Sequence, residues 1–146
     1  MIKSKEEKIG VKVTLTALLI WVVASVILFT ISARVFPVDN FTIEGLLTLS
    51  IVILSTIFWG ARAGKEIIRD NKHDDLTGIK TVFIILLTFL ILTMLFDGDF
   101  SKIMENKYTL TNAAKGFLFY SFIQLIPTII TGIIIGRRIK KLGRKY

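Results

Sequence analysis

The chain has 146 residues, of which 53% are hydrophobic and 21% charged, and its formal net charge is +8. It contains no cysteine and a single histidine, His73, so disulfides, thiolate metal sites and a multi-histidine metal site within one chain are excluded. The charges are confined to short blocks separated by uncharged apolar runs. Each run approaches the roughly 20 residues that cross about 30 Å of hydrocarbon, which is typical of a membrane protein.

The first apolar run, residues 13–33, follows a basic block and ends at Arg34. It is longer than the apolar core of a signal peptide and lacks a convincing small-x-small cleavage site before a mature domain, so we expect a retained transmembrane helix. The second run predicts a transmembrane helix over residues 44–62. Arg62 and Glu66 have the i,i+4 spacing of a helical ion pair, which predicts that this helix continues to Arg69, before a polar loop over residues 72–78.

The third run predicts a transmembrane helix over residues 79–96, which is short for a span and requires Lys80 to reach back to the headgroups. Residues 97–99 (Asp-Gly-Asp) then end this helix. Residues 100–108 carry apolar side chains at i, i+3, i+4 and i+8, which fits either a helix on the membrane surface or an ordinary loop. The fourth run predicts a helix over residues 116–136, followed by a basic tail over residues 137–146.

Lysine and arginine are distributed unevenly along the chain. Fifteen of the 19 lie before the first run, between the second and third runs, or in the tail. Because basic loops stay in the cytoplasm, this bias predicts four spans with both termini cytoplasmic, in the plasma membrane. The topology explains the net charge without a nucleic-acid partner. The free use of isoleucine, lysine, phenylalanine and asparagine is typical of a bacterial source.

One pattern, Thr-x3-Gly-x3-Gly followed by a basic residue, occurs twice, 72 residues apart. Its members are Thr56, Gly60, Gly64, Thr128, Gly132 and Gly136. Residues 10–12 (Gly-Val-Lys) and 78–80 (Gly-Ile-Lys) also match, 68 residues apart. These matches predict an internal repeat of two parallel helical hairpins, although membrane helices draw on few residue types and such matches also arise by chance. Because small residues four apart allow close backbone approach, we expect the second and fourth helices to pack together through these glycines.

The most polar group inside a predicted span is Gln124, Pro127 and Thr128, in the fourth helix. Pro127 removes a backbone amide, and Gln124 can hydrogen-bond to a neighbouring helix. The group is therefore a candidate binding or permeation point or, more simply, a helix-packing contact. Three acids at the outer edge fit either a hard-cation site or, more simply, a helix-capping turn: Asp97, Asp99 and Glu105.

No group of residues resembles a catalytic, cofactor or metal site, so we expect a non-enzymatic protein without a cofactor. The leading hypothesis is an accessory, regulatory or immunity-type protein that contacts other membrane components, with a membrane-protein partner or a second copy as candidates. The alternative is a small oligomeric transporter or channel with a pathway near Gln124 and Thr128. The cations of the tail are expected to contact anionic lipid headgroups. They are Arg137, Arg138, Lys140, Lys141, Arg144 and Lys145.

Overall fold

A computed structural model of the chain describes residues 4–32, 43–96 and 110–145, and all regular structure within these ranges is helical. The helices are α1 (Lys5–Ser32), α2 (Ile43–Gly64), the π-helical turn η1 (Lys65–Arg69), α3 (Asp74–Phe96) and α5 (Leu110–Gly143). The predicted all-α class is confirmed. The segment 100–108 and the acids Asp97, Asp99 and Glu105 lie outside the described residues.

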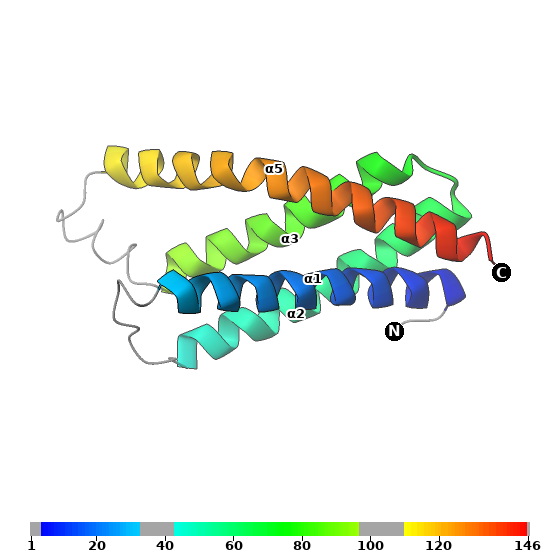
Figure 1. Cartoon of the computed structure of the whole chain (residues 1–146), viewed down its shortest axis with the longest axis horizontal. Helices are drawn as coiled ribbons and strands as arrows, with labels where there is room; N and C mark the ends of the chain where they lie inside the picture. The colour runs from blue at the N-terminus through cyan, green and yellow to red at the C-terminus, as the bar shows by residue number, and fades with distance from the viewer. Residues whose placement is uncertain (1–3, 33–42, 97–109, 146) are drawn as a thin grey trace.

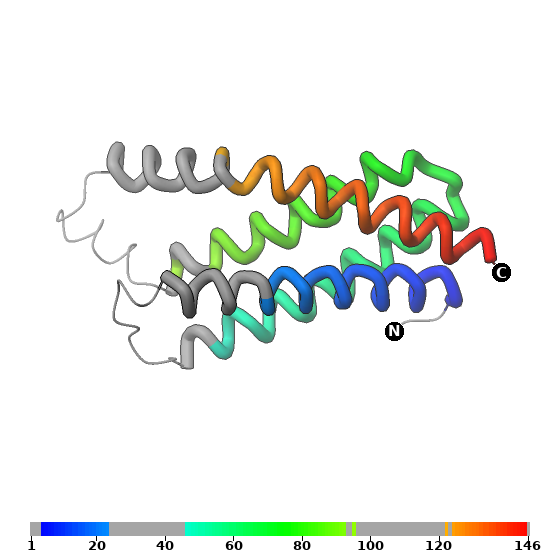
Figure 2. The backbone as a smooth tube through the Cα atoms, viewed as in Figure 1, coloured from blue at the N-terminus to red at the C-terminus, as the bar shows by residue number. Residues whose placement is uncertain are grey.

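The helices form two hairpins, α1 with α2 and α3 with α5 (Figure 1). Contacts of α2 with α3 and of α1 with α5 join the hairpins into one bundle. The start of α1, the turn from η1 into α3 and the end of α5 lie at the same end of this bundle (Figure 2). We call it the basic end (residues 5–12, 62–80 and 137–145), because fourteen of the fifteen described lysines and arginines belong to it.

Local sequence explains how helices begin and end there. Ser4 and Glu7 form a reciprocal capping box at the start of α1. The Glu7 N–H donates to Ser4 Oγ, and the Ser4 N–H donates to Glu7 Oε2, both at 3.3 Å. After η1, Asn71 adopts φ 50°, a left-handed conformation that asparagine tolerates and that commonly ends a helix. The Lys72 N–H donates back to the Glu66 carbonyl oxygen at 3.1 Å, which closes this helix end.

The predicted continuation of the second helix to Arg69 is confirmed, as a single π-helical turn. The predicted pair is also present, with Arg62 Nε 2.8 Å from Glu66 Oε1. The predicted polar loop over residues 72–78 is wrong in part, because α3 already begins at Asp74. Asp74 and Asp75 occupy the first turn of α3, where carboxylates interact favourably with the positive end of the helix dipole. Their polarity made the start of a helix resemble a loop.

The glycines of the first hairpin pack α1 against α2. A Cβ atom on Gly10 would meet the carbonyl oxygen of Gly60 and would lie 2.8 Å from the Cα atom of Gly64. No side chain fits between backbones this close. Thr14 and Thr56 are buried in the same hairpin, and each hydroxyl donates to the carbonyl oxygen four residues earlier, at 2.8 and 2.7 Å. The threonines therefore fill the seam without leaving a polar group unsatisfied.

The glycines of the second hairpin make the equivalent contacts between α3 and α5. A Cβ atom on Gly78 would meet the carbonyl oxygen of Gly132 and would lie 2.9 Å from the backbone nitrogen of Gly136. Thr128 of α5 is also buried. The expected packing of the second helix on the fourth through these glycines is therefore wrong, because each glycine pair faces the first helix of its own hairpin. Spacing along one helix shows which residues share a face, but not which neighbour that face meets.

A buried apolar cluster lies at the basic end and directly next to it. It is a cluster of Val13, Ala63, Ile67, Ile135 and Ile139, drawn from α1, α2, η1 and α5. Because it takes residues from both hairpins, this cluster holds the two hairpins together.

Away from the core, large apolar side chains point outwards from all four helices. Leu54 of α2 is 63% exposed and Ile126 of α5 is 67% exposed. Two segments in the described residues, Leu46–Arg69 and Asp74–Leu92, are long and apolar enough to cross a membrane. Each predicted span falls within a different helix, except that residue 33, the last residue of the first predicted span, lies outside the described ranges.

Candidate functional site

The last turns of α5 and the turn directly after it, Arg144–Lys145, carry a row of cations on one side. Their spacing of i, i+3, i+4, i+7 and i+8 aligns them in a helix with 3.6 residues per turn. We call them the cationic face: Arg137, Lys140, Lys141, Arg144 and Lys145. Another side of the same turns is packed into the core, where Ile135 is 2% and Ile139 0% exposed. Burial of these isoleucines therefore fixes the direction in which the cations point.

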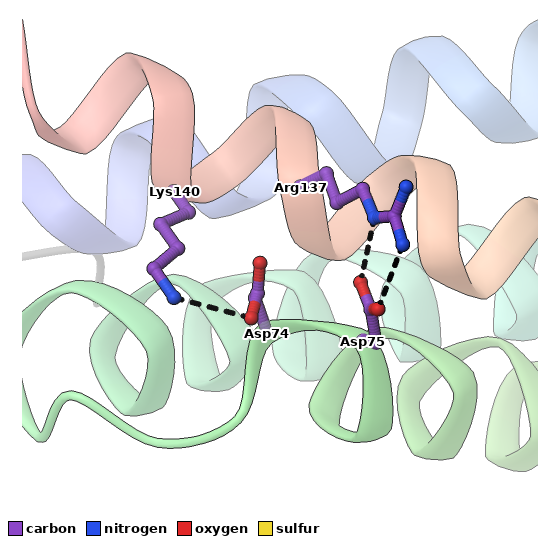
Figure 3. Close-up of polar contacts among 4 residues, drawn as sticks. All are labelled: Asp74, Asp75, Arg137 and Lys140. Carbon is purple, nitrogen blue, oxygen red and sulfur yellow. Dashed lines mark hydrogen bonds and ion pairs between the residues drawn. The ribbon is translucent and has the colours of Figure 1, made fainter.

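Two members of the cationic face are paired with the first turn of α3 (Figure 3). Arg137 makes a bidentate contact with Asp75, with Nε–Oδ1 at 3.0 Å and Nη2–Oδ2 at 3.1 Å. Lys140 Nζ lies 3.2 Å from Asp74 Oδ1. The hydrogen bond and the charge of Asp75 raise the pKa of Arg137 above its ordinary value. These contacts fix the last turns of α5 beside the start of α3.

An open hollow of about 330 Å³ lies beside these pairs. It is lined by Asp74 and by all five members of the cationic face. Within the described part of the chain, no carboxylate lies within ion-pair distance of Lys141, Arg144 or Lys145. The hollow therefore combines one carboxylate with several cations that retain free donor capacity. Ammonium and guanidinium groups in such an arrangement suit the oxygens of a phosphate or carboxylate anion.

The structure thus brings together five of the six tail cations that the sequence singled out. The sixth, Arg138, is exposed but does not line the hollow. Sequence reasoning missed Asp74 and Asp75, although a pattern could have found them. In both segments of the predicted repeat two adjacent acids stand four and three residues before the first glycine, as Glu6 and Glu7 do before Gly10. Comparing the repeats over a longer stretch would have placed all four acids in helices.

The polar group in the middle of α5 lies apart from this hollow. Gln124 is partly buried, Pro127 is exposed and Thr128 is 5% exposed. None of the three lines the hollow at the basic end. Thr128 occupies the position equivalent to Thr56 of the first hairpin, 72 residues earlier, and both are buried. The buried hydroxyl of Thr128 thus fits the helix-packing interpretation.

Together these features define an all-helical protein of two packed hairpins with a cationic hollow at one end. Comparison with known protein families, with characterised proteins and with solved structures finds no match.

Proposed function

We propose that this chain is a four-span membrane protein with both termini in the cytoplasm, and that it acts without catalysis through contacts with other membrane components. The observation that carries the proposal is the division of its surface. Large apolar side chains are exposed along all four helices, whereas the cations gather at one end. In water such an apolar surface would aggregate, but in a bilayer it is the expected exterior.

The composition of the seams supports the same proposal. Lipid tails are as apolar as leucine, so helices in a bilayer gain little by turning leucine inwards and pack instead through small residues. The seams of both hairpins contain closely packed glycines and buried threonines, as a bilayer favours. Ile67 and Ile139 of the core cluster lie beyond residues 62 and 136, where the proposed second and fourth spans end, while Ile135 lies at the edge of the fourth span. Water reaches this level, so the hydrophobic effect can drive burial there.

The finer architecture that we propose is a pair of parallel copies. Residues of α1 and α3 correspond at an offset of 68, and residues of α2 and α5 at an offset of 72. Trp21 and Phe89 are equivalent at the first offset, and their rings meet edge-on with centroids 6.2 Å apart. Ile67 and Ile139 are equivalent at the second, and both belong to the core cluster. Contact between equivalent residues is what packing about a two-fold axis produces.

The proposed topology can be tested by cysteine labelling, because the native chain has no cysteine. We expect Lys72→Cys and Lys145→Cys to react with a membrane-impermeant maleimide only after the cytoplasmic face is opened. We expect Asn40→Cys and Asn106→Cys to react in intact cells. The cysteine-free parent chain is the control for background labelling. Labelling of Lys72→Cys and Asn40→Cys from the same side would contradict the four-span arrangement.

Photocrosslinking in the native membrane tests the proposed action through contacts. A photoreactive amino acid replaces Leu54 or Phe58 of α2, or the equivalent Ile126 or Ile130 of α5, all of which are exposed. A partner protein or second copy that seats on one side should give a discrete crosslinked band from one pair of positions but not from the other. The equivalent pair in the other hairpin is thus a matched control. Crosslinks to lipid alone from all four positions would argue against a protein partner on these faces.

A further inference from the structure

We propose that the hollow between the cationic face and the first turn of α3 binds the phosphate group of an anionic phospholipid. This inference rests on the proposed membrane location and adds a defined headgroup site to it. The first support is charge. Asp74 is paired with Lys140, and Asp75 with Arg137. Lys141, Arg144 and Lys145 line the hollow and have no carboxylate partner in the described chain. Each lysine carries three N–H donors and the arginine five, and these donors suit the several acceptor oxygens of a phosphodiester.

The second support is the position of the hollow along α5. Arg137 follows directly after residue 136, where the proposed fourth span ends. From Arg137 to Gly143, where α5 ends, the helix rises about 9 Å, at about 1.5 Å per residue. The polar headgroup layer is roughly 5–8 Å thick on each side of the hydrocarbon. Arg137, Lys140 and Lys141 therefore lie at headgroup depth, and Arg144 and Lys145 close the hollow from the water side.

The third support distinguishes a lipid from a soluble phosphate. Ile126, Ile130 and Ile134 stand four residues apart on α5, and they are 67%, 53% and 55% exposed. This spacing makes a continuous apolar ridge, and the next positions on the same side are Arg137 and Lys141. An acyl chain lying on the ridge would bring its phosphate to the hollow. A free phosphate ion would make no use of the ridge.

The test is native mass spectrometry of the whole chain in neutral detergent, with equal amounts of phosphatidylglycerol and phosphatidylcholine. We expect the wild type to retain phosphatidylglycerol preferentially. The variant Lys141→Gln/Arg144→Gln/Lys145→Gln should lower this preference roughly a hundredfold, since each cation near an anionic lipid surface contributes about fivefold. The matched control Lys8→Gln/Lys12→Gln/Lys72→Gln removes three exposed cations from the same end and should retain the preference. Equal loss in both variants would show general charge attraction and overturn the site.

A second variant guards against a misfolded triple mutant. Asp74→Asn removes the one carboxylate from the hollow and releases Lys140, so it should raise phosphatidylglycerol retention roughly fivefold. A gain of binding cannot come from unfolding, and no gain would contradict the site. Inorganic phosphate at millimolar concentration should not displace the lipid, and displacement would identify a soluble anion as the ligand instead. Lipid retention in detergent is independent of the cysteine labelling pattern, so each proposal can fail separately.

Discussion

Gly132→Leu is expected to destabilise the second hairpin by about 3 kcal/mol or more, because the new side chain must enter a seam where backbone meets backbone. A Cβ atom at this position would already meet the Cα atom of Ile79, and would lie 2.6 Å from its nitrogen and 3.0 Å from the carbonyl carbon of Gly78. Backbone atoms cannot rotate away as a side chain can, so α3 and α5 must separate. Thermal unfolding in detergent, followed by circular dichroism, measures the loss.

Two controls sharpen this prediction. Ile134→Leu lies two residues further along α5, at a position 55% exposed. It should leave the free energy of unfolding within about 0.5 kcal/mol of the wild-type value. Gly60→Leu, at the equivalent position of the first hairpin, should have a smaller effect than Gly132→Leu. A Cβ atom on Gly60 would lie 3.0 Å from Cβ and Oγ1 of Thr14 and 3.2 Å from the carbonyl oxygen of Gly10, which is a less severe clash than the one at Gly132. A wild-type midpoint for Gly132→Leu would contradict the close approach of α3 and α5.

Ile67→Ala and Ile139→Ala are each expected to cost about 2–5 kcal/mol, because both side chains are almost completely buried. The two residues come from different hairpins and belong to one core cluster. Their effects should therefore be non-additive, with a coupling free energy of about 0.5–3 kcal/mol in a double-mutant cycle. Unfolding by a denaturing detergent, followed by tryptophan fluorescence, gives the free energies for all four proteins.

The matched control cycle uses Leu54→Ala and Ile126→Ala. These positions are also equivalent at an offset of 72, but they are 63% and 67% exposed. Leu54 lies on α2, which η1 continues, and Ile126 lies on α5. Their effects should be small and additive, because no shared contact links them. Additive effects at Ile67 and Ile139 would show that the core does not join the hairpins, and would remove one support for the two-fold arrangement.

The cationic hollow illustrates how a candidate site is only partly visible in a sequence. The concentration of lysine and arginine after residue 136 indicated contact with anionic headgroups, because charge composition needs no knowledge of the fold. The partners of two of those cations, Asp74 and Asp75, lie more than sixty residues earlier in the chain. No periodicity within α5 reveals them. Only the packing of Gly78 against Gly132 and Gly136 brings the start of α3 beside the last turns of α5.

The sequence by itself determined the helical class, the positions of the four long helices and the recurrence of their small residues. These follow from local properties: a long apolar run in each helix, and glycines four residues apart on one face. The i,i+4 pair of Arg62 and Glu66 was predictable for the same reason, since both groups lie on one helix.

Only the tertiary structure decided which faces meet. The twin glycine patterns were expected to join the second helix to the fourth, but each one packs against the first helix of its own hairpin. Both arrangements satisfy the same local rules, because a glycine face accepts any backbone that can approach it. The choice depends on the whole set of contacts, including the isoleucine core shared by the hairpins and the ion pairs of Asp74 and Asp75 with α5. Such contacts join residues far apart in the chain, so patterns within a short stretch of sequence do not predict them.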